Sequence, residues 1–265
     1  MRPPAVGVAG RRILVTGASR GIGRGLAEAF ARGGADLALV ARKSAALDEV
    51  AAITGGTAYP CDLSDREEVA GLAERIEADG PVDVLVNNAG ISNVGFVLDA
   101  RPDDIDAVID VDLRAPLHLT RDLLPGMIAR GRGHVVNVSS LAAVMSPPGL
   151  AYYAAAKAGL SAYTAVLRQD LRGLPILVTA VHLGSVPTDL DDLSRQYGPL
   201  KAAAESSSGR DVTPLPDAVA AIVDAVRAGR PEVRLPRALA LLPALADLPR
   251  ALTRLVFRRY APRPE

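Results

Sequence analysis

The sequence predicts an α/β fold of three layers, in which helices cover both faces of a parallel sheet. The first observation is that short apolar segments alternate with helical patterns along most of the 265 residues. The second is that these short segments are almost uniformly apolar, which is typical of strands buried on both faces. The third is that every motif with chemical character follows such a strand, where ligands bind in open α/β sheets.

The first 60 residues of the sequence contain three expected strands and two expected helices. The first strand is short, apolar and β-branched, and the three strands lie at residues 12–16, 37–40 and, with a weaker pattern, 57–60. Helical patterns run through residues 25–30 and 44–52. Gly33 and Gly34 end the first helix, because glycine adopts the backbone conformation that is common at helix C-termini.

The rest of the sequence adds strands that are expected at residues 82–86, 134–138 and 176–181. Ser64 is a favourable N-cap for a helix at residues 65–79, with Glu67 at the capping-box position. Further helices are expected at residues 103–128, interrupted around Pro116, at 150–172 and at 217–228. Because right-handed crossovers connect parallel strands, the carboxyl ends of the strands meet at one edge of the sheet.

Composition narrows the class of protein. The 30 basic residues balance the 30 acidic ones, so no net charge favours nucleic acid, and no nucleic-acid partner is expected. The single Cys61 cannot form an internal disulfide, which fits a reducing compartment and a cytoplasmic location. The sequence has no C-x-x-C and no histidine cluster, so no metal site is expected. The sequence has no run of 18 apolar residues, so no membrane span is expected.

Residues 16–23 form a glycine-rich turn, T-G-A-S-R-G-I-G, directly after the first strand. Gly17 permits the tight turn, and Gly21 and Gly23 let the backbone approach a pyrophosphate and the helix pack on the sheet. The helix N-terminus then offers N–H groups and partial positive charge to phosphates. An ordinary glycine turn is the alternative interpretation. The spacing T-G-x-x-x-G-x-G also differs from the G-x-G-x-x-G of most dinucleotide-binding folds.

The residues after the second strand indicate which dinucleotide binds. An acidic residue there would bind the ribose 2′-hydroxyl of NAD. This sequence has Arg42 and Lys43 instead, with Arg20 in the glycine turn. Because arginine binds phosphate bidentately, the pattern favours NADP(H) over NAD(H), the alternative being a solvated basic loop. Asp62, after the third strand, is positioned either to accept from the adenine amino group or to cap the next helix.

Tyr153 and Lys157 lie four residues apart on an expected helix, and hence on one of its faces. A tyrosine hydroxyl titrates near ~10 in water, and a neighbouring ammonium lowers its pKa by favouring the phenolate. The pair is therefore a candidate for proton transfer, and the lysine is also suited to hold a ribose. Ser140, at the end of the fifth strand, is positioned to hydrogen-bond a substrate oxygen beside Tyr153.

In combination, these motifs resemble the short-chain dehydrogenase/reductase family. The matching segments span about residues 10–190 in the family's order and are T-G-A-S-R-G-I-G at 16–23, N-N-A-G at 87–90, V-S-S at 138–140 and Y-A-A-A-K at 153–157. The resemblance implies a Rossmann-type, doubly wound sheet. It also implies that Ser140 orients the substrate, that Tyr153 is the general acid/base, and that Lys157 holds the ribose and tunes the tyrosine.

The resemblance extends to the cofactor site. The residues expected to contact the cofactor are Gly17, Ser19, Arg20, Gly21, Ile22, Gly23, Arg42, Asp62, Leu63, Asn88, Ala89, Gly90, Tyr153, Lys157, Val186 and Thr188. Tyr152 and Ser139 adjoin the residues assigned to catalysis, and the spacing selects against them.

Two departures from the family pattern concern the site. Asp112 stands where the family usually has an asparagine that helps hold a water for proton relay to the lysine. Asp112, included among the expected catalytic residues, either holds the same water or pairs with Lys157 and alters its tuning. After the sixth strand, Leu183 replaces a proline of the family motif, but Val186 and Thr188 remain positioned for the nicotinamide carboxamide and the phosphates.

The C-terminal part is expected to complete a single domain of residues 1–265 with a substrate loop at about 187–216 and a helical extension at about 237–260. The chain lacks the short glycine-containing strand and tail in which many tetrameric family members end. Leucines at helical spacing predict that the extension packs on the body or on a partner subunit of a homodimer or homotetramer. Peripheral membrane contact is the alternative, against which Pro243 and Pro249 argue because proline breaks a helix.

The leading hypothesis is an NADP-dependent oxidoreductase that interconverts a carbonyl and a secondary alcohol in a small-molecule substrate, with a lipophilic substrate among the options. A dinucleotide-binding sensor or scaffold without turnover is the first alternative. A sugar-nucleotide epimerase or dehydratase is the second, since such enzymes share the glycine turn and Y-x-x-x-K but are usually longer.

Overall fold

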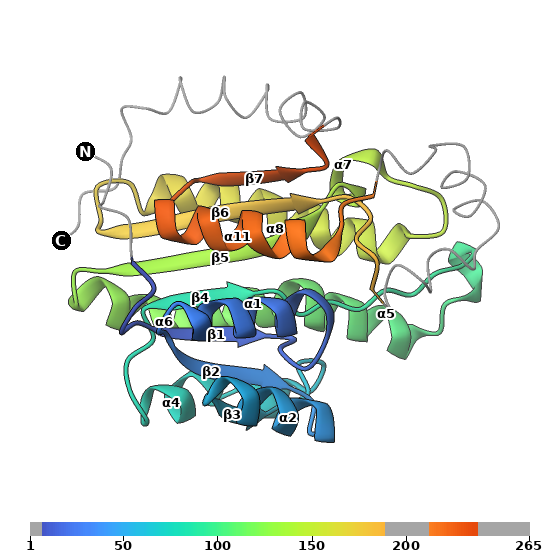
Figure 1. Ribbon diagram of the computed structural model, residues 1–265. Coiled ribbons are helices and arrows are strands. Elements are labelled where there is room, and N and C mark those ends of the chain that lie inside the picture. The colour runs from blue at the N-terminus through green and yellow to red at the C-terminus, as the bar shows by residue number, and fades with distance from the viewer. Residues whose placement is uncertain (1–6, 189–211, 238–265) are drawn as a thin grey trace.

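Seven parallel strands form one twisted sheet in the computed structural model, which describes residues 7–188 and 212–237 (Figure 1). The strand order is β3-β2-β1-β4-β5-β6-β7. The strands are β1 (Arg12–Thr16), β2 (Asp36–Ala41), β3 (Thr57–Pro60), β4 (Val84–Asn87), β5 (Gly133–Ser140), β6 (Ile176–Leu183) and β7 (Glu232–Leu235). The order reverses between β1 and β4, so the predicted doubly wound, Rossmann-type sheet is confirmed.

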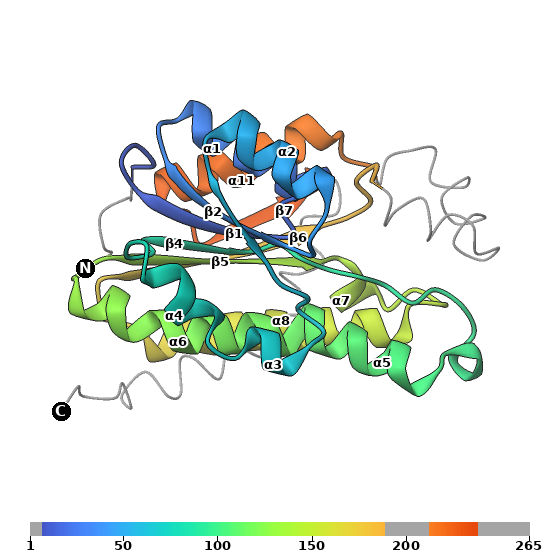
Figure 2. The ribbon, with the colours of Figure 1, turned by 90° about the horizontal axis from the view of Figure 1, so that it is seen from below.

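Helices cover both faces of this sheet, as the three-layer prediction requires (Figure 2). One face carries α1 (Gly21–Arg32), α2 (Ala45–Thr54) and α11 (Leu215–Ala228). The other carries α3 (Arg66–Val69), α4 (Leu72–Glu77), α5 (Pro102–Ile109), α6 (Ala115–Ala129) and α8 (Ala151–Asp170). The short α7 (Ala142–Met145) follows the carboxyl end of β5.

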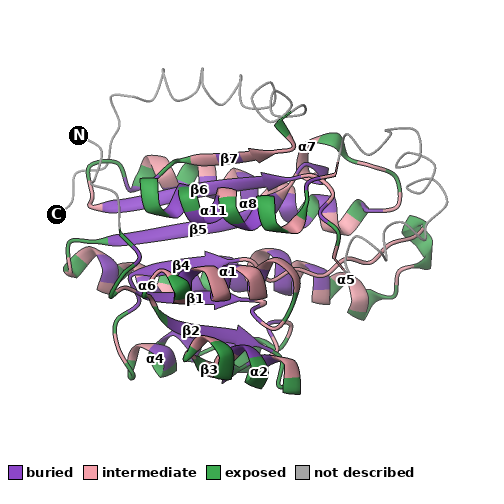
Figure 3. Cartoon of the chain, viewed as in Figure 1, coloured by how far each residue is buried: buried purple, intermediate pink, exposed green. Residues whose placement is uncertain are grey.

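The central strands are buried on both faces because their side chains alternate between the two helical layers. In β1, Ile13 and Val15 belong to the same apolar core as Phe30 of α1. The intervening Leu14 belongs to the opposite core, with Leu119 of α6. Figure 3 shows the result, with buried central strands and helices that carry buried, intermediate and exposed residues. This alternation explains why the three consecutive residues in the middle of β1 are all apolar.

The helix expected at residues 65–79 is two short helices, so the single-helix prediction is wrong. Asp65 is the N-cap of α3 and accepts hydrogen bonds from the backbone N–H groups of Glu67 and Glu68. Ser64, the expected N-cap, instead donates to Asp62 from its backbone N–H and its hydroxyl. Gly71, with a φ of +80°, separates α3 from α4 because a left-handed residue cannot continue a right-handed helix.

The long helix expected at residues 103–128 is interrupted, as predicted, but by a π-helical turn at Asp110–Arg114. The turn separates α5 from α6 and lies just before Pro116. Proline has no N–H, so Pro116 cannot donate to the carbonyl one turn earlier, and the regular hydrogen-bond pattern fails there. Such turns are often found at functional sites.

The sheet ends in β7, which pairs in parallel with β6 and was not predicted as a strand. Among residues 187–216, α11 begins at Leu215, and Ser185 forms an isolated bridge with Val212. Most of the expected substrate loop and nearly all of the expected C-terminal extension lie outside the described residues. Within the described ranges, no helix has the length and hydropathy to cross a bilayer.

Candidate active site

The carboxyl edge of the sheet gathers segments that lie far apart in the sequence. Thr188, after β6, lies over the start of α1, because a Cβ atom added to Gly21 would be 3.3 Å from Thr188 Cγ2. Gly90, after β4, lies against the middle of α8, because a Cβ atom there would be 3.3 Å from Lys157 Nζ. Val186 is buried beside this edge, with 6% of its surface exposed. The loop after each of these strands therefore contributes to one site.

The turn between β1 and α1 has the geometry of an anion site. Gly17 and Gly21 have φ values of +68° and +53°, which favour glycine. A Cβ atom on Gly23 would overlap the carbonyl oxygen of Gly17, so only glycine allows the helix to begin this close to the turn. The N-cap Arg20 makes no side-chain capping bond, and the first turn of α1 has no acidic residue. Its N–H groups and dipole thus suit a phosphate, and the residues present fit a dinucleotide.

Thr16 fixes the segment after β4 against the glycine turn. Its hydroxyl accepts hydrogen bonds from the backbone N–H groups of Asn88 and Ala89, both at 3.0 Å. The side-chain amide of Asn88 donates to the carbonyl oxygen of Thr16 at 2.9 Å. The approach is so close that a Cβ atom on Gly17 would lie 2.9 Å from Ala89 Cα. Thr16 is thus a positioning residue, a role that the sequence analysis did not assign to it although it is the first residue of the glycine-rich turn.

Arg42, after β2, and Asp62, after β3, lie close enough to interact electrostatically. Arg42 is exposed. Burial raises the pKa of Asp62, but hydrogen bonds from Ser64 and the charge of Arg42 outweigh it, so the pKa lies below its ordinary value. Asp62 therefore structures the turn before α3, while Leu63 is buried with 6% exposure.

Lys157 and Asp112 form a buried ion pair at the centre of the site. Lys157 Nζ lies 3.2 Å from Asp112 Oδ2, with 4% and 0% of the two side chains exposed. The ammonium also donates to the carbonyl oxygen of Val138 at 3.1 Å, and Asp112 Oδ1 accepts from the backbone N–H of Ile91 at 2.8 Å. Asp112 thus pairs with Lys157 directly, one of the two arrangements that the sequence left open. The π-helical turn carries Asp112 to this position.

Tyr153 lies beside this ion pair, one helical turn before Lys157. The ammonium nitrogen is 5.7 Å from the centre of the tyrosine ring. Tyr153 is partly exposed and packs against an apolar cluster of Ala142, Leu150 and Ala154. The nearby Ser140 hydroxyl lowers the pKa of Tyr153 by favouring the phenolate.

The charges around Tyr153 act on its pKa in opposite directions. Burial raises the pKa of Tyr153, the positive charge of Lys157 lowers it, and the negative charge of Asp112 raises it again. Burial lowers the pKa of Lys157, but Asp112 more than compensates, so the ammonium is held charged. Burial raises the pKa of Asp112 above its ordinary value, against the influence of Lys157. The net effect is a phenol that keeps its proton more firmly than free tyrosine.

The neighbouring Ser139 and Tyr152 each make a hydrogen bond to a backbone carbonyl oxygen. Ser139 is buried and its hydroxyl donates to the carbonyl oxygen of Lys157 at 3.0 Å. Tyr152 Oη donates to the carbonyl oxygen of Val97 at 2.9 Å. Ser140, in contrast, keeps a partly exposed side chain at the end of β5.

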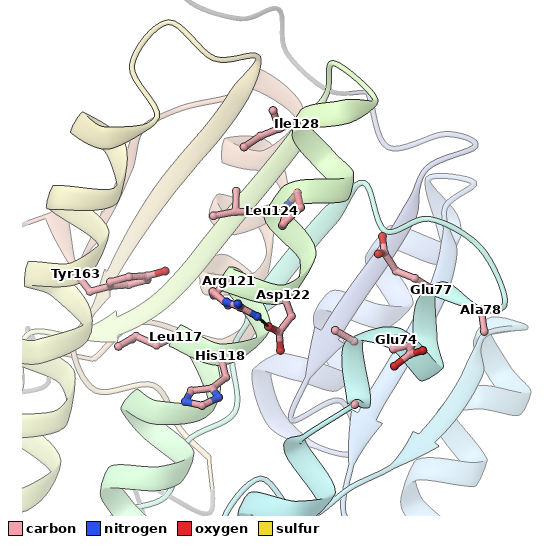
Figure 4. Close-up of a pocket in the computed structure, with 13 residues that line it drawn as sticks. Glu74, Glu77, Ala78, Leu117, His118, Arg121, Asp122, Leu124, Ile128 and Tyr163 are labelled. Atoms are coloured by element: carbon pink, nitrogen blue, oxygen red, sulfur yellow. Dashed lines mark hydrogen bonds and ion pairs between the residues drawn. The ribbon is translucent and has the colours of Figure 1, made fainter. Parts of the chain in front are cut away.

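A groove elsewhere on the molecule contains none of the expected site residues (Figure 4). It has a volume of about 1370 Å³ and runs between α4 and α6, with Tyr163 of α8 on its far side. It lies on the outer helical layer, away from the carboxyl edge of the sheet. Among the described residues, no three His, Cys, Asp or Glu side chains gather as they would around a metal ion.

Comparisons with known proteins give a consistent result. Residues 11–197 match the family model for short chain dehydrogenase. An uncharacterized short-chain type dehydrogenase/reductase of Sinorhizobium fredii is 43% identical over 178 residues, 67% of this chain and 70% of that protein. A short chain dehydrogenase of Pseudocercospora fijiensis is 41% identical over 191 residues, 68% of this chain but only 61% of that protein's length. Among solved structures, a short-chain dehydrogenase from Sphingobium yanoikuyae in complex with NADPH has a TM-score of 0.80 and 26% identity, covering 92% of this chain and 95% of that one.

Proposed function

Since this chain belongs to the short-chain dehydrogenase family, we propose that it is an NADP-dependent oxidoreductase that interconverts a carbonyl and a secondary alcohol. The observation that carries the proposal is the arrangement of Tyr153 beside Lys157 and Ser140 at the carboxyl edge of the sheet. A phenol next to a buried ammonium at this edge of the sheet is suited to proton transfer. The glycine turn, Thr188 and Gly90 adjoin the same edge.

The cofactor is assigned to residues along this edge. The N-terminus of α1 is uncapped by side chains, which suits the pyrophosphate. The exposed Arg42 suits a 2′-phosphate, and the NADPH bound by the Sphingobium protein supports NADP(H) over NAD(H). Residues 88–90 would line the nicotinamide side, with Lys157 near the ribose. When bound, the nicotinamide would supply a hydride to the carbonyl carbon in reduction and accept one from the alcohol carbon in oxidation.

The proton chemistry is assigned to Tyr153. In carbonyl reduction its phenol gives a proton to the substrate oxygen, and in alcohol oxidation its phenolate takes that proton back. The Ser140 hydroxyl holds the same oxygen by a hydrogen bond, and Lys157 stabilises the phenolate electrostatically. Asp112 holds Lys157 in position and partly offsets its charge, which makes it a positioning residue.

Other parts of the proposal concern assembly and location. The free Cys61 is buried, and burial raises the pKa of its thiol to about 11, so it has the character of an unreactive core residue in a reducing, cytoplasmic setting. A homodimer or homotetramer is proposed on the family resemblance alone, and light scattering would test it.

The experiment that tests the proposed function compares Tyr153→Phe with wild type. NADPH oxidation would be followed with a panel of ketones, aldehydes and steroids, and NADP reduction with the matching alcohols. Loss of the hydroxyl should lower turnover by about 10²- to 10⁴-fold while NADPH binding stays nearly unchanged. Tyr152→Phe, one residue earlier on α8, is the matched control and should keep most of its activity.

Retention of more than a tenth of the wild-type rate in Tyr153→Phe would exclude the role assigned to this residue. A wild-type chain that binds NADPH and turns over no compound would fit the sensor or scaffold alternative. The Asp112–Lys157 ion pair is the one observation in favour of that alternative, because the carboxylate opposes phenolate formation.

A further inference from the structure

We infer that the substrate of this site is an uncharged, lipophilic ketone or secondary alcohol. Its apolar part lies against two segments near Tyr153, residues 87–98 after β4 and residues 135–156 from β5 to the start of α8. The inference rests on the proposed function and adds the chemical class of the substrate. It depends on three observations: an apolar cluster around Tyr153, a concentration of exposed apolar side chains beside it, and an absence of charge from both segments.

The first observation is the apolar cluster that Tyr153 itself joins. Ala142 and Leu150, from the connection between β5 and α8, are buried with Ala154, and Val94 from the segment after β4 packs against them. A substrate oxygen that reaches the Tyr153 phenol is therefore attached to a carbon skeleton lying on hydrocarbon. Burial of apolar substrate surface there is favourable by the hydrophobic effect.

The second observation is a group of large apolar side chains that solvent reaches. We define the apolar rim as Phe96, Val97, Leu98 and Met145, which are 57%, 45%, 81% and 53% exposed. Only two other large apolar side chains of the described residues are comparably exposed, Ile53 on α2 and Val166 on α8. Isolated exposed residues need no explanation, but a concentration beside a catalytic group is typical of a ligand site.

The rim is held in place by hydrogen bonds between its two segments. Gly95 donates its backbone N–H to the carbonyl oxygen of Gly149 at 3.0 Å. Tyr152 donates its hydroxyl to the carbonyl oxygen of Val97 at 2.9 Å. Figure 1 shows the segment after β4 reaching the loop between α7 and α8. The apolar residues after β4 are thus fixed beside the start of the helix that carries Tyr153.

The third observation is the absence of charge. Residues 87–98 and 135–156 contain no Asp, Glu, Lys or Arg, whereas such residues make up 23% of the whole chain. Asp99, directly after the first segment, is an anion, and Lys157, directly after the second, is already paired with Asp112. A substrate with a carboxylate or phosphate on this side would lose its hydration without a cationic partner from either segment. An uncharged hydrocarbon skeleton fits, and a sugar nucleotide does not.

The first test is a series of methyl ketones that differ only in alkyl length, from butan-2-one to decan-2-one. The value of kcat/KM should rise about 2- to 4-fold per methylene until the alkyl chain extends beyond the rim. Keto acids of the same length with a terminal carboxylate should be at least about tenfold poorer. A flat series, or equal rates for the keto acids, would overturn the inference.

The second test replaces one rim residue with a charged residue. Leu98→Asp should reduce the rise in kcat/KM per methylene and leave NADPH affinity nearly unchanged. Ile53→Asp is the matched control, because it removes an isomeric and similarly exposed side chain from α2. An equal rise per methylene in both variants would show that the rim does not contact the substrate.

The two tests separate this inference from the proposed function. If wild type reduces no ketone, and Tyr153→Phe is indistinguishable from it, the proposed function fails. If butan-2-one is reduced through Tyr153 but chain length has no effect, only the substrate class is wrong. Binding to phosphatidylcholine vesicles that Leu98→Asp abolishes, with the chain-length series unchanged, would assign the rim to a lipid surface and overturn the inference.

Discussion

Asp112 is the residue whose chemistry sets this site apart from a simple tyrosine–lysine pair. Its carboxylate is fully buried and is held by the Ile91 backbone and by Lys157. Removing one member of a buried ion pair usually leaves an uncompensated charge, which costs about 3–5 kcal/mol. Asparagine would keep the shape of the side chain and the acceptor for Ile91, so it isolates the effect of the charge.

Asp112→Asn should retain or raise activity and shift the pH–rate profile of alcohol oxidation. The negative charge of Asp112 raises the pKa of Tyr153, so its removal should lower that pKa. Alcohol oxidation requires the phenolate, and the rising basic limb should therefore move to lower pH. A deuterated alcohol would verify that the chemical step limits the rate.

The matched control is Asp110→Asn in the same π-helical turn. Asp110 is also buried, but its charge is balanced by Arg114 at 2.6 Å and Arg66 at 3.2 Å. Its replacement should leave the pH of the basic limb of the pH–rate profile unchanged, even if it lowers the stability of the folded protein. If the basic limb of Asp112→Asn moved to higher pH, the carboxylate of Asp112 would lower the pKa of Tyr153 and not raise it, which would contradict the electrostatic argument.

Arg42→Ala should weaken NADPH binding far more than NADH binding. A charge-assisted contact with the 2′-phosphate contributes about 1.5–3 kcal/mol, which corresponds to about 10- to 150-fold in Kd. Titration of intrinsic or cofactor fluorescence would give both constants. Arg24→Ala is the control, because Arg24 is already paired with Glu28 and Glu49. Equal losses for the two cofactors would identify Arg42 as a solvated surface residue.

At the scale of secondary structure elements, the edge strand β7 depends on charge for its attachment to β6. Glu232 accepts from Arg234 at 2.7 Å and lies 3.5 Å from the imidazole of His182 on β6. Burial opposes ionisation of Glu232, but hydrogen bonds from His182 and Arg234 outweigh it and lower its pKa to about 2. The polar face of β7 is thereby tied to the sheet, which its four residues of backbone pairing alone would hold weakly.

Glu232→Gln should lower the free energy of unfolding at neutral pH by about 1–2 kcal/mol. The loss is no larger because Glu232 is partly exposed and solvent screens its interactions with His182 and Arg234. The folded-state pKa lies below the ordinary 4.5, so the contribution is complete above about pH 4.5 and is lost as the pH falls toward 2. Urea unfolding at pH 7 and pH 3 should show the variant and wild type converging at the lower pH. Asp104→Asn, which breaks the exposed ion pair with Arg101, should have little effect at either pH.

At the scale of the whole molecule, the sequence was sufficient to predict the strands and helices whose residues are uniformly buried. The strand at 12–16 was predicted because its central residues, Ile13, Leu14 and Val15, are apolar and are buried between the two helical layers. β7 was missed because polar Glu232 and Arg234 alternate with apolar residues on an edge strand only four residues long. The break at Gly71 was missed because a single glycine does not by itself end a helical pattern.

In the candidate site, contacts between residues close in the sequence could be predicted, and contacts between residues far apart in the sequence could not. Tyr153 and Lys157 could be paired from their spacing, because a helix turns local sequence into geometry. The contact of Asp112 with Lys157 could be given only as one of two options, because a π-helical turn sets it. The bonds from Asn88 to Thr16 span 72 residues, and no local pattern encodes them.

Thr16 also has a thermodynamic consequence for ligand association. Its hydroxyl fixes the backbone of residues 88–89 in the folded chain, and Asp112 fixes Ile91 in turn. The loss of conformational entropy in this loop therefore occurs when the chain folds and not when a ligand arrives. A ligand that meets an ordered loop retains more of its interaction free energy as affinity. Replacement of Thr16 would transfer that entropy loss to the binding step, where calorimetry would register it as a less favourable entropy of association.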